Sequence, residues 1–535
     1  MSNKAHHSCC PGNPPSETHS TLCSSCRLSS GTASHGGALL RDMIKRVMVE
    51  AVAVLYFIGV LLLVLSGTMI LPILADLYTG TPDWHVFLVS AIVTCSVGAT
   101  TTIAYRPLRS IIILSTRQAF LLTTGAWLVV CSFGSLPFLF SSLNMSPTDA
   151  FFEAMSGLTT TGSTVMTGLD TAPRGILLWR SLLQWLGGIG IIVMAVAVFP
   201  DLRIGGMQLF RMESSDKTDK AMPRVSQIAG TITVLYGLFS VVCALILWVA
   251  GMDGFDAINH AMTTLATGGY STFDQSVGHF QSPLIEWILI IFMMIGATPF
   301  VLFIMLWQHK EWRLLGDSQV RWFYGGTAVS VLVLATWLWT ARDISYNNAL
   351  RSAAFNVVSV ITTCGYVSTD YATWGGFAQT IFFWLTFVGG CTGSTSGAIK
   401  VFRFQVLFSL IAVQFKRLLH QTGVFLVHFD KEQISDDVVR SVQGFVVLYT
   451  VCFTVIASAL MVTGLNLVTA LSGSATALGN VGPGLGPTIG PAGNFSSLSD
   501  TAKWILACTM LLGRLELLTV LVLLRRSFWQ DHRVS

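Results

Sequence analysis

The sequence predicts an all-α integral membrane protein with two leading N-terminal transmembrane helices and four pseudo-symmetric helix–pore-loop–helix repeats around one pore. Composition is the first reason, because 52% of the 535 residues are hydrophobic and only 11% are charged, too few to cover a soluble domain of this length. The second is that apolar stretches of about 20 residues, long enough to cross a bilayer, recur along the chain. The third is a short glycine-containing segment that occurs four times.

Ten membrane spans are expected, of which the first two, at 47–75 and 85–105, carry no glycine segment. Each later unit has a first span, an apolar stretch of about ten residues that is too short to cross, the glycine segment and a second span. The first and second spans are expected, unit by unit, at 118–141 and 174–199, 228–251 and 283–308, 322–341 and 376–412, and 441–463 and 502–524. The parts of the chain are then a head at 1–38, the leading pair at 39–112, and units at 113–222, 223–318, 319–430 and 431–535.

The distribution of basic residues predicts the orientation. Arg41, Lys45 and Arg46 precede the first span, whereas the loops 142–173 and 252–284 contain no Lys or Arg. By the positive-inside rule both termini are expected in the cytoplasm, and all four glycine segments then open to the outside. The net charge of +4 is small and lies in short loops, which argues against a nucleic-acid partner.

Eleven cysteines are present, and seven of them are scattered through apolar segments, where a free thiol behaves as a small hydrophobic group. No disulfide framework is expected. The other four lie in the head, which is predicted to be a disordered cytoplasmic tail because it is rich in Ser, Gly and Pro. A zinc site is the alternative, since Cys23 and Cys26 have ligand spacing, but the adjacent pair Cys9 and Cys10 and the lack of a surrounding core argue against it.

The glycine segments align on Gly162, Gly269, Gly365 and Gly482, each with Leu or Ile four residues earlier. A short apolar helix followed by polar irregular backbone, with both flanks outside, has to be re-entrant. Such backbone is tolerated at membrane depth only where it lines a path, because each unpaired group exposed to lipid costs several kcal/mol. A single copy could equally be an ordinary loop or a helix contact, but four copies in equivalent positions favour a pore.

Successive carbonyls can face one axis only in backbone conformations that glycine permits, which predicts a carbonyl-lined selectivity filter at these segments. None of the segments carries a charge, whereas divalent-cation filters commonly use carboxylates and anion pores use Arg or Lys, so a weakly hydrated K⁺ is favoured. The C-terminal ends of the four short helices would concentrate cations there. The expected filter residues are Thr160, Thr161, Gly162 and Ser163; Thr267, Gly268, Gly269 and Tyr270; Thr363, Cys364, Gly365 and Tyr366; and Asn480, Val481, Gly482 and Pro483.

At these residues, over about 40–530, the chain resembles the Trk/Ktr/HKT superfamily of potassium transporters, and most closely its bacterial TrkH-type membrane subunit. The resemblance implies potassium uptake across the bacterial inner membrane, with glycine rather than serine at the first filter position favouring K⁺ over Na⁺. It also implies a homodimer and a separate cytoplasmic nucleotide-binding subunit of the TrkA type, with no cofactor in this chain besides the transported K⁺. The fourth segment departs from the others because it lacks their threonines.

A cluster of small and polar residues interrupts the expected second span of the third unit. Glycines four residues apart are typical of close helix packing, but the additional glycine, serines and threonines favour a break in the helix. The resemblance implies an intramembrane loop that obstructs the pore beneath the filter. The expected gate residues are Gly389, Gly390, Gly393, Ser394, Thr395, Ser396, Gly397 and Lys400, together with Arg514.

Arg514 lies near the middle of the last span, where a charge needs a partner or water. An ion pair between helices is as consistent with the sequence as a role in the pore, and the resemblance implies a position close to the gating loop. Glu516 and Lys400 are the expected partners. Four further polar residues, Glu153, Arg180, His260 and Glu286, are expected to cap or snorkel at the outer ends of their helices.

Other classes of function are less consistent with the sequence. An enzyme is disfavoured, since there is no HExxH motif and the Gly393–Gly397 run has Thr395 where a nucleophile elbow has serine. No nucleotide-binding fingerprint is present. A secondary transporter would be expected to carry inverted repeats, whereas these units run in one orientation. Coupling of potassium uptake to H⁺ or Na⁺, and a less selective K⁺/Na⁺ pathway, stay open as alternatives.

Overall fold

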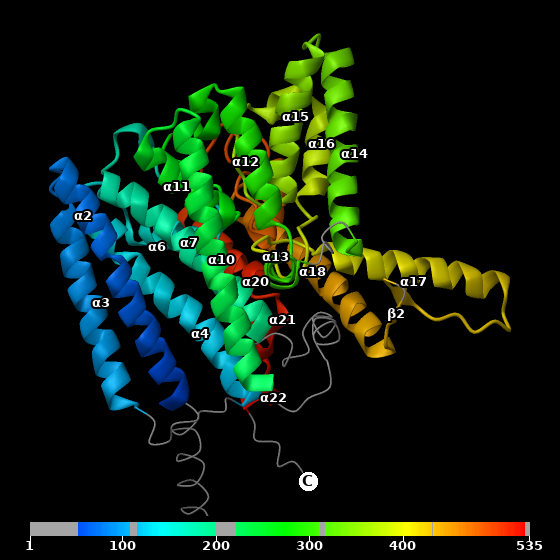
Figure 1. Cartoon of the computed structure of the whole chain (residues 1–535), viewed down its shortest axis with the longest axis horizontal. Helices are drawn as coiled ribbons and strands as arrows, with labels where there is room; N and C mark the ends of the chain where they lie inside the picture. The colour runs from blue at the N-terminus through cyan, green and yellow to red at the C-terminus, as the bar shows by residue number, and fades with distance from the viewer. Residues whose placement is uncertain (1–51, 107–114, 198–220, 311–315, 431, 530–535) are drawn as a thin grey trace, which may run out of the picture. The chain divides into compact units, whose positions relative to one another are not determined.

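The computed structural model describes residues 52–106, 115–197, 221–310, 316–430 and 432–529. The head with its cysteines and the basic residues that precede the first span lie outside these ranges. The seven helices that are straight, long and apolar enough to cross a membrane begin with Val52–Thr79, whose last part is α2 (Ile70–Thr79). Helix α3 (Trp84–Ala104) packs beside α2, as Figure 1 shows.

The leading pair is fastened to the first unit at its outer loop. The Asp76 carboxylate accepts a hydrogen bond of 2.7 Å from the backbone N–H of Gly175. Asp83 accepts bonds from both the backbone N–H and the hydroxyl of Ser142, at 3.1 and 2.8 Å. These two carboxylates therefore hold α2 and α3 against the helices that carry the first glycine segment.

Four helices that are too short to cross a bilayer end directly before the glycine segments. Three of them begin with a side-chain cap, from Ser146, Asp253 or Asn466, which accepts a hydrogen bond from a backbone N–H of the first turn. The four helices are α6 (Pro147–Leu158), α11 (Gly254–Leu265), α15 (Tyr346–Ile361) and α19 (Leu467–Gly479). Each follows a first span, and these spans are α4 (Thr116–Gly134) with α5 (Leu136–Phe140), α10 (Ala221–Val249), α14 (Ser318–Ala341) and α18 (Asp436–Val462).

The second spans differ from one another, and two of those predicted as single spans, in the second and fourth units, are each bent into two helices. Only α7 (Arg174–Ala197) is continuous. The expected span 283–308 is α12 (Pro283–Gly296) and α13 (Phe300–His309), bent by 92°, and 502–524 is α20 (Asp500–Arg514) and α21 (Leu518–Leu521), bent by 108°. The expected span 376–412 is α16 (Gly376–Leu385) and α17 (Val401–Leu419), with non-helical backbone between them.

Hydropathy located these segments but could not distinguish a straight apolar helix from a broken one. Pro299 explains the first bend, since proline cannot continue a helix. The bend after α20 has no such residue: Glu516 and Leu517 take left-handed φ angles of 61° and 52°, which are rare for such side chains.

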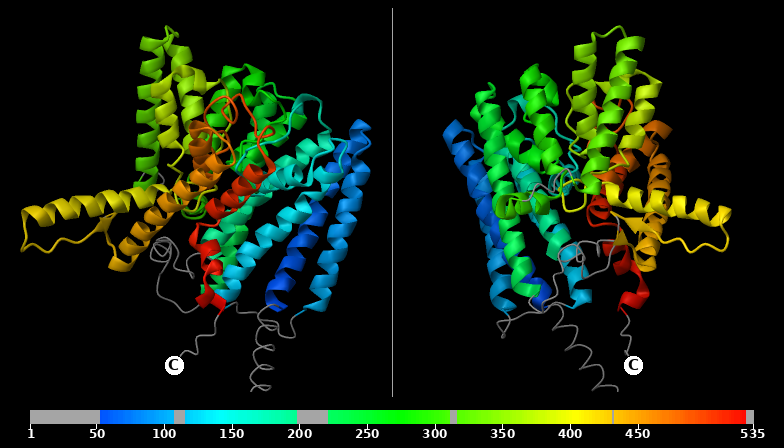
Figure 2. Two further views of the ribbon diagram at one scale, coloured as in Figure 1. Left: turned by 180° about the vertical axis from the view of Figure 1, so that it is seen from behind. Right: turned by 45° about the vertical axis from the view of Figure 1, so that its right-hand side comes forward.

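The rest of the described chain is short connecting structure. Helix α17 packs on α14 and α18 and runs across the direction of α14 in Figures 1 and 2. After it comes the only strand pair in the described residues, β1 (His428–Phe429) antiparallel to β2 (Glu432–Gln433). The remaining elements are η1 (Leu169–Thr171), η2 (Ser276–Phe280), η3 (Tyr371–Trp374), η4 (Val522–Leu524) and α22 (Arg526–Trp529). The all-α prediction holds apart from that four-residue hairpin.

Candidate functional site

The four glycine segments, far apart in the sequence, come together in cyclic order. Every aligned glycine has a left-handed φ, of 83°, 71°, 85° and 112° in chain order. A Cβ added to any of them would meet the carbonyl oxygen of the residue just before the glycine in the next segment. These contacts are Gly162 with Gly268 O, Gly269 with Cys364 O, Gly365 with Val481 O, and Gly482 with Thr161 O. The last contact closes the ring from the fourth segment back to the first.

The residue two positions before each glycine also has a left-handed φ, and it turns the chain at the end of the short helix. These residues are Thr160, Thr267, Thr363 and Asn480, with φ between 50° and 60°. Asparagine tolerates this conformation, but threonine rarely takes it. This conformation could not be predicted at the three threonines, because only the aligned glycines indicated unusual backbone.

The residue after each glycine joins its segment to the preceding one in the ring. The Ser163 hydroxyl donates to Gly482 O at 2.9 Å. The Tyr270 hydroxyl donates to Glu153 O at 3.0 Å, and the Tyr366 hydroxyl donates to His260 O at 3.1 Å. Pro483 is the nearest side chain to Gly365. All of the predicted filter residues therefore lie in one interlocked ring, in which only Gly162, Gly269, Gly365 and Pro483 are partly exposed.

Behind the first two segments lies an ion pair that the sequence analysis misplaced. Arg180 Nε donates to Glu153 Oε1 at 2.8 Å, and both side chains are at most 1% exposed. Arg180 also donates to Ser271 O at 2.9 Å and to the Thr164 hydroxyl at 3.1 Å. The Glu153 carboxylate accepts from the backbone N–H of Val165 at 3.0 Å. Neither side chain snorkels, because each finds its partners inside the protein.

The other two residues expected at outer helix ends are also largely buried. His260 lies in the same network as Arg180, since its Nε2 is 3.0 Å from the Ser271 hydroxyl. Glu286 lies 3.4 Å from Arg351, in a more exposed ion pair. The signal that could have located the Glu153–Arg180 pair is the presence of opposite charges in the short helix and second span of one unit.

Gln184 is a further residue that sequence reasoning missed. Its Nε2 donates to Gly268 O at 2.6 Å, and its Oε1 accepts from the backbone N–H of Tyr270 at 3.1 Å. Gly268 therefore differs from its counterparts in the ring, because within the described residues no hydrogen bond reaches the carbonyls of Thr161, Cys364 or Val481. Those three oxygens are available to a cation.

The residues expected to form the gate are non-helical from Thr386 to Lys400, so this run is a break in the span and not a helix packing face. This loop, 386–400, is buried against the ends of three short helices. The Thr395 hydroxyl donates to Leu265 O at 3.0 Å, and the Gly397 N–H donates to the Thr363 hydroxyl at 2.7 Å. Ala398 N–H donates to Gly479 O at 2.9 Å.

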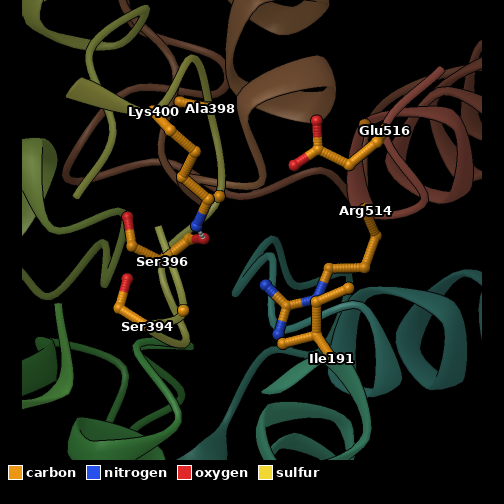
Figure 3. A pocket seen from close by; sticks show the side chains of 10 residues that line it. Ile191, Ser394, Ser396, Ala398, Lys400, Arg514 and Glu516 are labelled. Carbon is orange, nitrogen blue, oxygen red and sulfur yellow. Dashed lines mark hydrogen bonds between the residues drawn. The ribbon is translucent and has the colours of Figure 1, made fainter. Parts of the chain in front are cut away.

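A small cavity beside the loop is lined by both apolar and polar residues, and Figure 3 labels the five that are charged or polar. They are Ser394, Ser396, Lys400, Arg514 and Glu516. Lys400 Nζ donates to Ser396 O, as the dashed line shows. Arg514 Nη1 donates to Thr395 O at 2.9 Å, and its Nη2 reaches Gly187 O on α7 at 3.4 Å. Arg514 therefore connects the loop with the first unit.

The expected partners of Arg514 are bonded elsewhere. Glu516 forms its ion pair with Arg403 of α17, a residue that the sequence analysis did not consider, and Lys400 binds a carbonyl. The Arg403 guanidinium lies 3.6 Å from the centre of the Phe445 ring. The hydrogen bond of Arg514 to Thr395 O follows from the loop, because non-helical backbone leaves carbonyls that need donors.

Comparison with known proteins identifies the family. Residues 85–534 match the model of the TrkH family, described as a cation transport protein. The chain is 44% identical to the Trk system potassium uptake protein TrkI of Halomonas elongata over 89% of this chain and 97% of that protein. It is 40% identical to the Trk system potassium uptake protein TrkH of Escherichia coli K12 over 90% of this chain and 99% of that one. The crystal structure of the potassium transporter TrkH from Vibrio parahaemolyticus matches with a TM-score of 0.83 and 36% identity, over 90% and 99% of the two chains.

Proposed function

Because this chain belongs to the TrkH family of cation transport proteins, we propose that it takes up potassium across a bacterial inner membrane, through a path enclosed by the four glycine segments. The observation that carries this proposal is the cyclic contact of each glycine with the carbonyl of the next segment. Four backbone turns closed in a ring inside an apolar protein have the form of a cation filter. The relatives named above are potassium uptake proteins, and this chain matches them over almost their whole length.

The chemistry of the ring supports K⁺ as the ion. The segments contribute carbonyls and hydroxyls but no carboxylate or cationic side chain, which suits replacement of the hydration shell of a monovalent cation. The short helices α6, α11, α15 and α19 all end at the ring, so their partial negative ends favour a cation there. Glycine at Gly162 favours K⁺ over Na⁺ by resemblance to the family.

The gate in this proposal is the loop 386–400 held by Arg514. The loop bonds to the inner ends of α11, α15 and α19, directly under the ring, and Arg514 fastens it to α7. Conduction therefore requires the loop to move. The family further suggests cytoplasmic termini, a homodimer of this chain, and regulation by a nucleotide-binding subunit of the TrkA type that docks on the cytoplasmic face.

Potassium uptake by a bacterium that lacks its own uptake systems tests this function. The chain is expected to restore growth at low K⁺. Gly162→Ser is expected to admit Na⁺, because the altered backbone at the first position relaxes the carbonyl ring. If the unsubstituted chain and Gly162→Ser have the same K⁺ flux and the same Na⁺ flux, the filter assignment is contradicted.

Deletion of 393–396 is expected to increase ion leak, and an unchanged leak in correctly assembled protein would contradict the gate assignment.

A further inference from the structure

One side chain of the ring is bonded to the gating loop and not to its own helix. The Thr363 hydroxyl accepts a hydrogen bond of 2.7 Å from the backbone N–H of Gly397. It also lies 3.3 Å from the hydroxyl of Ser396. All three residues are buried, so the Gly397 N–H has no access to bulk water in this conformation. Thr363 thus satisfies a loop amide that would otherwise be unpaired.

The equivalent residues of the other units make different contacts. The Thr160 hydroxyl is buried and has no hydrogen-bond partner within the described residues. Thr267 bonds to Ala266 O at 2.8 Å and reaches the Thr395 hydroxyl at only 3.2 Å. Asn480 donates to Thr161 and to Met510 O on α20. The shortest side-chain bond from this ring of residues to the loop is therefore the one that Thr363 makes.

We propose that Thr363 is a positioning residue of the gate: its hydroxyl latches the loop beneath the filter by accepting the Gly397 N–H. This inference rests on the proposed function, in which the loop obstructs the path. Release of the loop breaks this bond, and a water-filled path can then hydrate the freed amide. Without the hydroxyl the amide is unpaired only while the loop is in place, so the closed state alone is destabilised.

The position of Thr363 also links the gate to the filter. It precedes Gly365 by two residues and holds the left-handed turn, with φ of 60°, that sends the chain into the ring. Movement of this turn displaces the acceptor of the loop amide. A free energy of coupling acts in both directions, so a change in filter geometry shifts the loop equilibrium and a change in the loop shifts the filter.

The test is the K⁺ flux of the full chain in liposomes without any regulatory subunit, measured for Thr363→Val and Thr363→Ser. Valine keeps the shape and removes the acceptor, and it is expected to raise the basal flux about fivefold, which corresponds to the loss of one hydrogen bond from the closed state. Serine keeps the hydroxyl and is expected to raise the basal flux less than valine does.

The matched control is Thr362→Val. Thr362 is the neighbouring threonine and is equally buried, but its hydroxyl donates to Val358 O at 2.7 Å within its own helix. The same flux in Thr363→Val as in the unsubstituted chain would overturn the latch. So would an equal increase in Thr362→Val or Thr363→Ser, because the effect would then not depend on the hydroxyl at 363.

A second substitution covers the case in which Thr363→Val does not assemble. Thr363→Cys keeps a polar atom of similar position but is a much weaker acceptor, so an increased flux is again expected, and an unchanged flux overturns the proposal. The loop deletion separates this inference from the proposed function. If the deletion raises leak while Thr363→Val and Thr363→Cys do not, the loop is the gate but Thr363 does not hold it.

Discussion

The second spans of the first and third units differ in backbone structure where they pass the inner ends of their short helices. Helix α7 is continuous, and it approaches α6 through Gly187, where an added Cβ would strike Leu158 O. In the third unit the corresponding chain is non-helical from Thr386 to Lys400. In a continuous helix the backbone amides and carbonyls bond to one another, whereas the amides and carbonyls of a non-helical segment must bond to neighbouring elements.

This difference decides which groups hold the glycine segments in each unit. Around the first unit the long side chains of Arg180 and Gln184, both on α7, reach Ser271 O and Gly268 O. Around the third unit the backbone of the loop reaches Thr363, through Gly397, and the end of α19 at Gly479, through Ala398. We therefore expect substitutions on α7 to change stability and selectivity, and substitutions at the loop to change gating.

The largest effect is expected from Arg180→Met, which leaves the Glu153 carboxylate buried without its counter-charge. Removal of one member of a buried ion pair costs about 3–5 kcal/mol, so a large decrease in the thermal unfolding midpoint of the detergent-solubilised protein is expected. The double substitution Glu153→Gln with Arg180→Met removes both charges and is expected to recover most of the loss. A double variant as unstable as the single one would show that packing, and not charge pairing, holds this region.

The control is the ion pair of Arg351 with Glu286, which is longer, at 3.4 Å, and leaves Arg351 26% exposed. Arg351→Met is expected to cost less than Arg180→Met, because the contact with Glu286 is longer and both side chains are more exposed than those of the Arg180–Glu153 pair. Equal losses in the two arginine variants would contradict the special role of α7.

The next effect is expected from Arg514→Met, since Arg514 joins the two compared regions. It donates to Thr395 O in the loop and to Gly187 O on α7. Hydrogen bonds from a charged group contribute about 1.5–3 kcal/mol, so an increase of about tenfold or more in basal K⁺ flux is expected. Arg514→Lys should give an intermediate flux, because a point charge cannot reach both carbonyls in fork geometry. If Arg514→Met has the basal flux of the unsubstituted chain, Arg514 does not hold the gate closed.

The same two regions show what could be predicted from sequence. Hydropathy and the glycine alignment located all four short helices, and the cluster at 389–397 indicated a broken helix. The partners could not be predicted, since Thr363 and Gly397 meet only when the third unit folds back on itself. The bend at Leu517 had no signal either, because no glycine or proline stands there and the left-handed backbone is imposed by the surroundings.

A smaller effect, on selectivity, is expected from Gln184→Leu. It removes the donor to Gly268 O and the acceptor of Tyr270 N–H, and it puts an apolar side chain of similar size in their place. With Gly268 O free to move toward the ion, the ring loses its fixed spacing on one side, and the ratio of K⁺ to Na⁺ flux is expected to fall severalfold. Basal flux should change little, because the hydrogen bonds of Gln184 in the described residues go to Gly268 and Tyr270 and not to the loop. A changed basal flux with unchanged selectivity would reverse the roles assigned to the two regions.

The smallest effect is expected from Tyr270→Phe. The lost hydroxyl donates to Glu153 O at 3.0 Å, and one neutral hydrogen bond contributes about 1 kcal/mol. The segment keeps its other supports, because Arg180 and Gln184 still hold Ser271 O and Gly268 O.

Tyr366→Phe is the matched change in the third unit, where the hydroxyl lies 2.5 Å from Thr263 Oγ1 and 3.1 Å from His260 O. In the described residues that segment is held by neutral groups, such as the Ser359 hydroxyl that donates to Tyr366 O at 2.6 Å, and by no charged side chain like Arg180, so the third-unit variant should lose more thermal stability than Tyr270→Phe. The reverse order would mean that the loop backbone supports its segment as firmly as the α7 side chains support theirs.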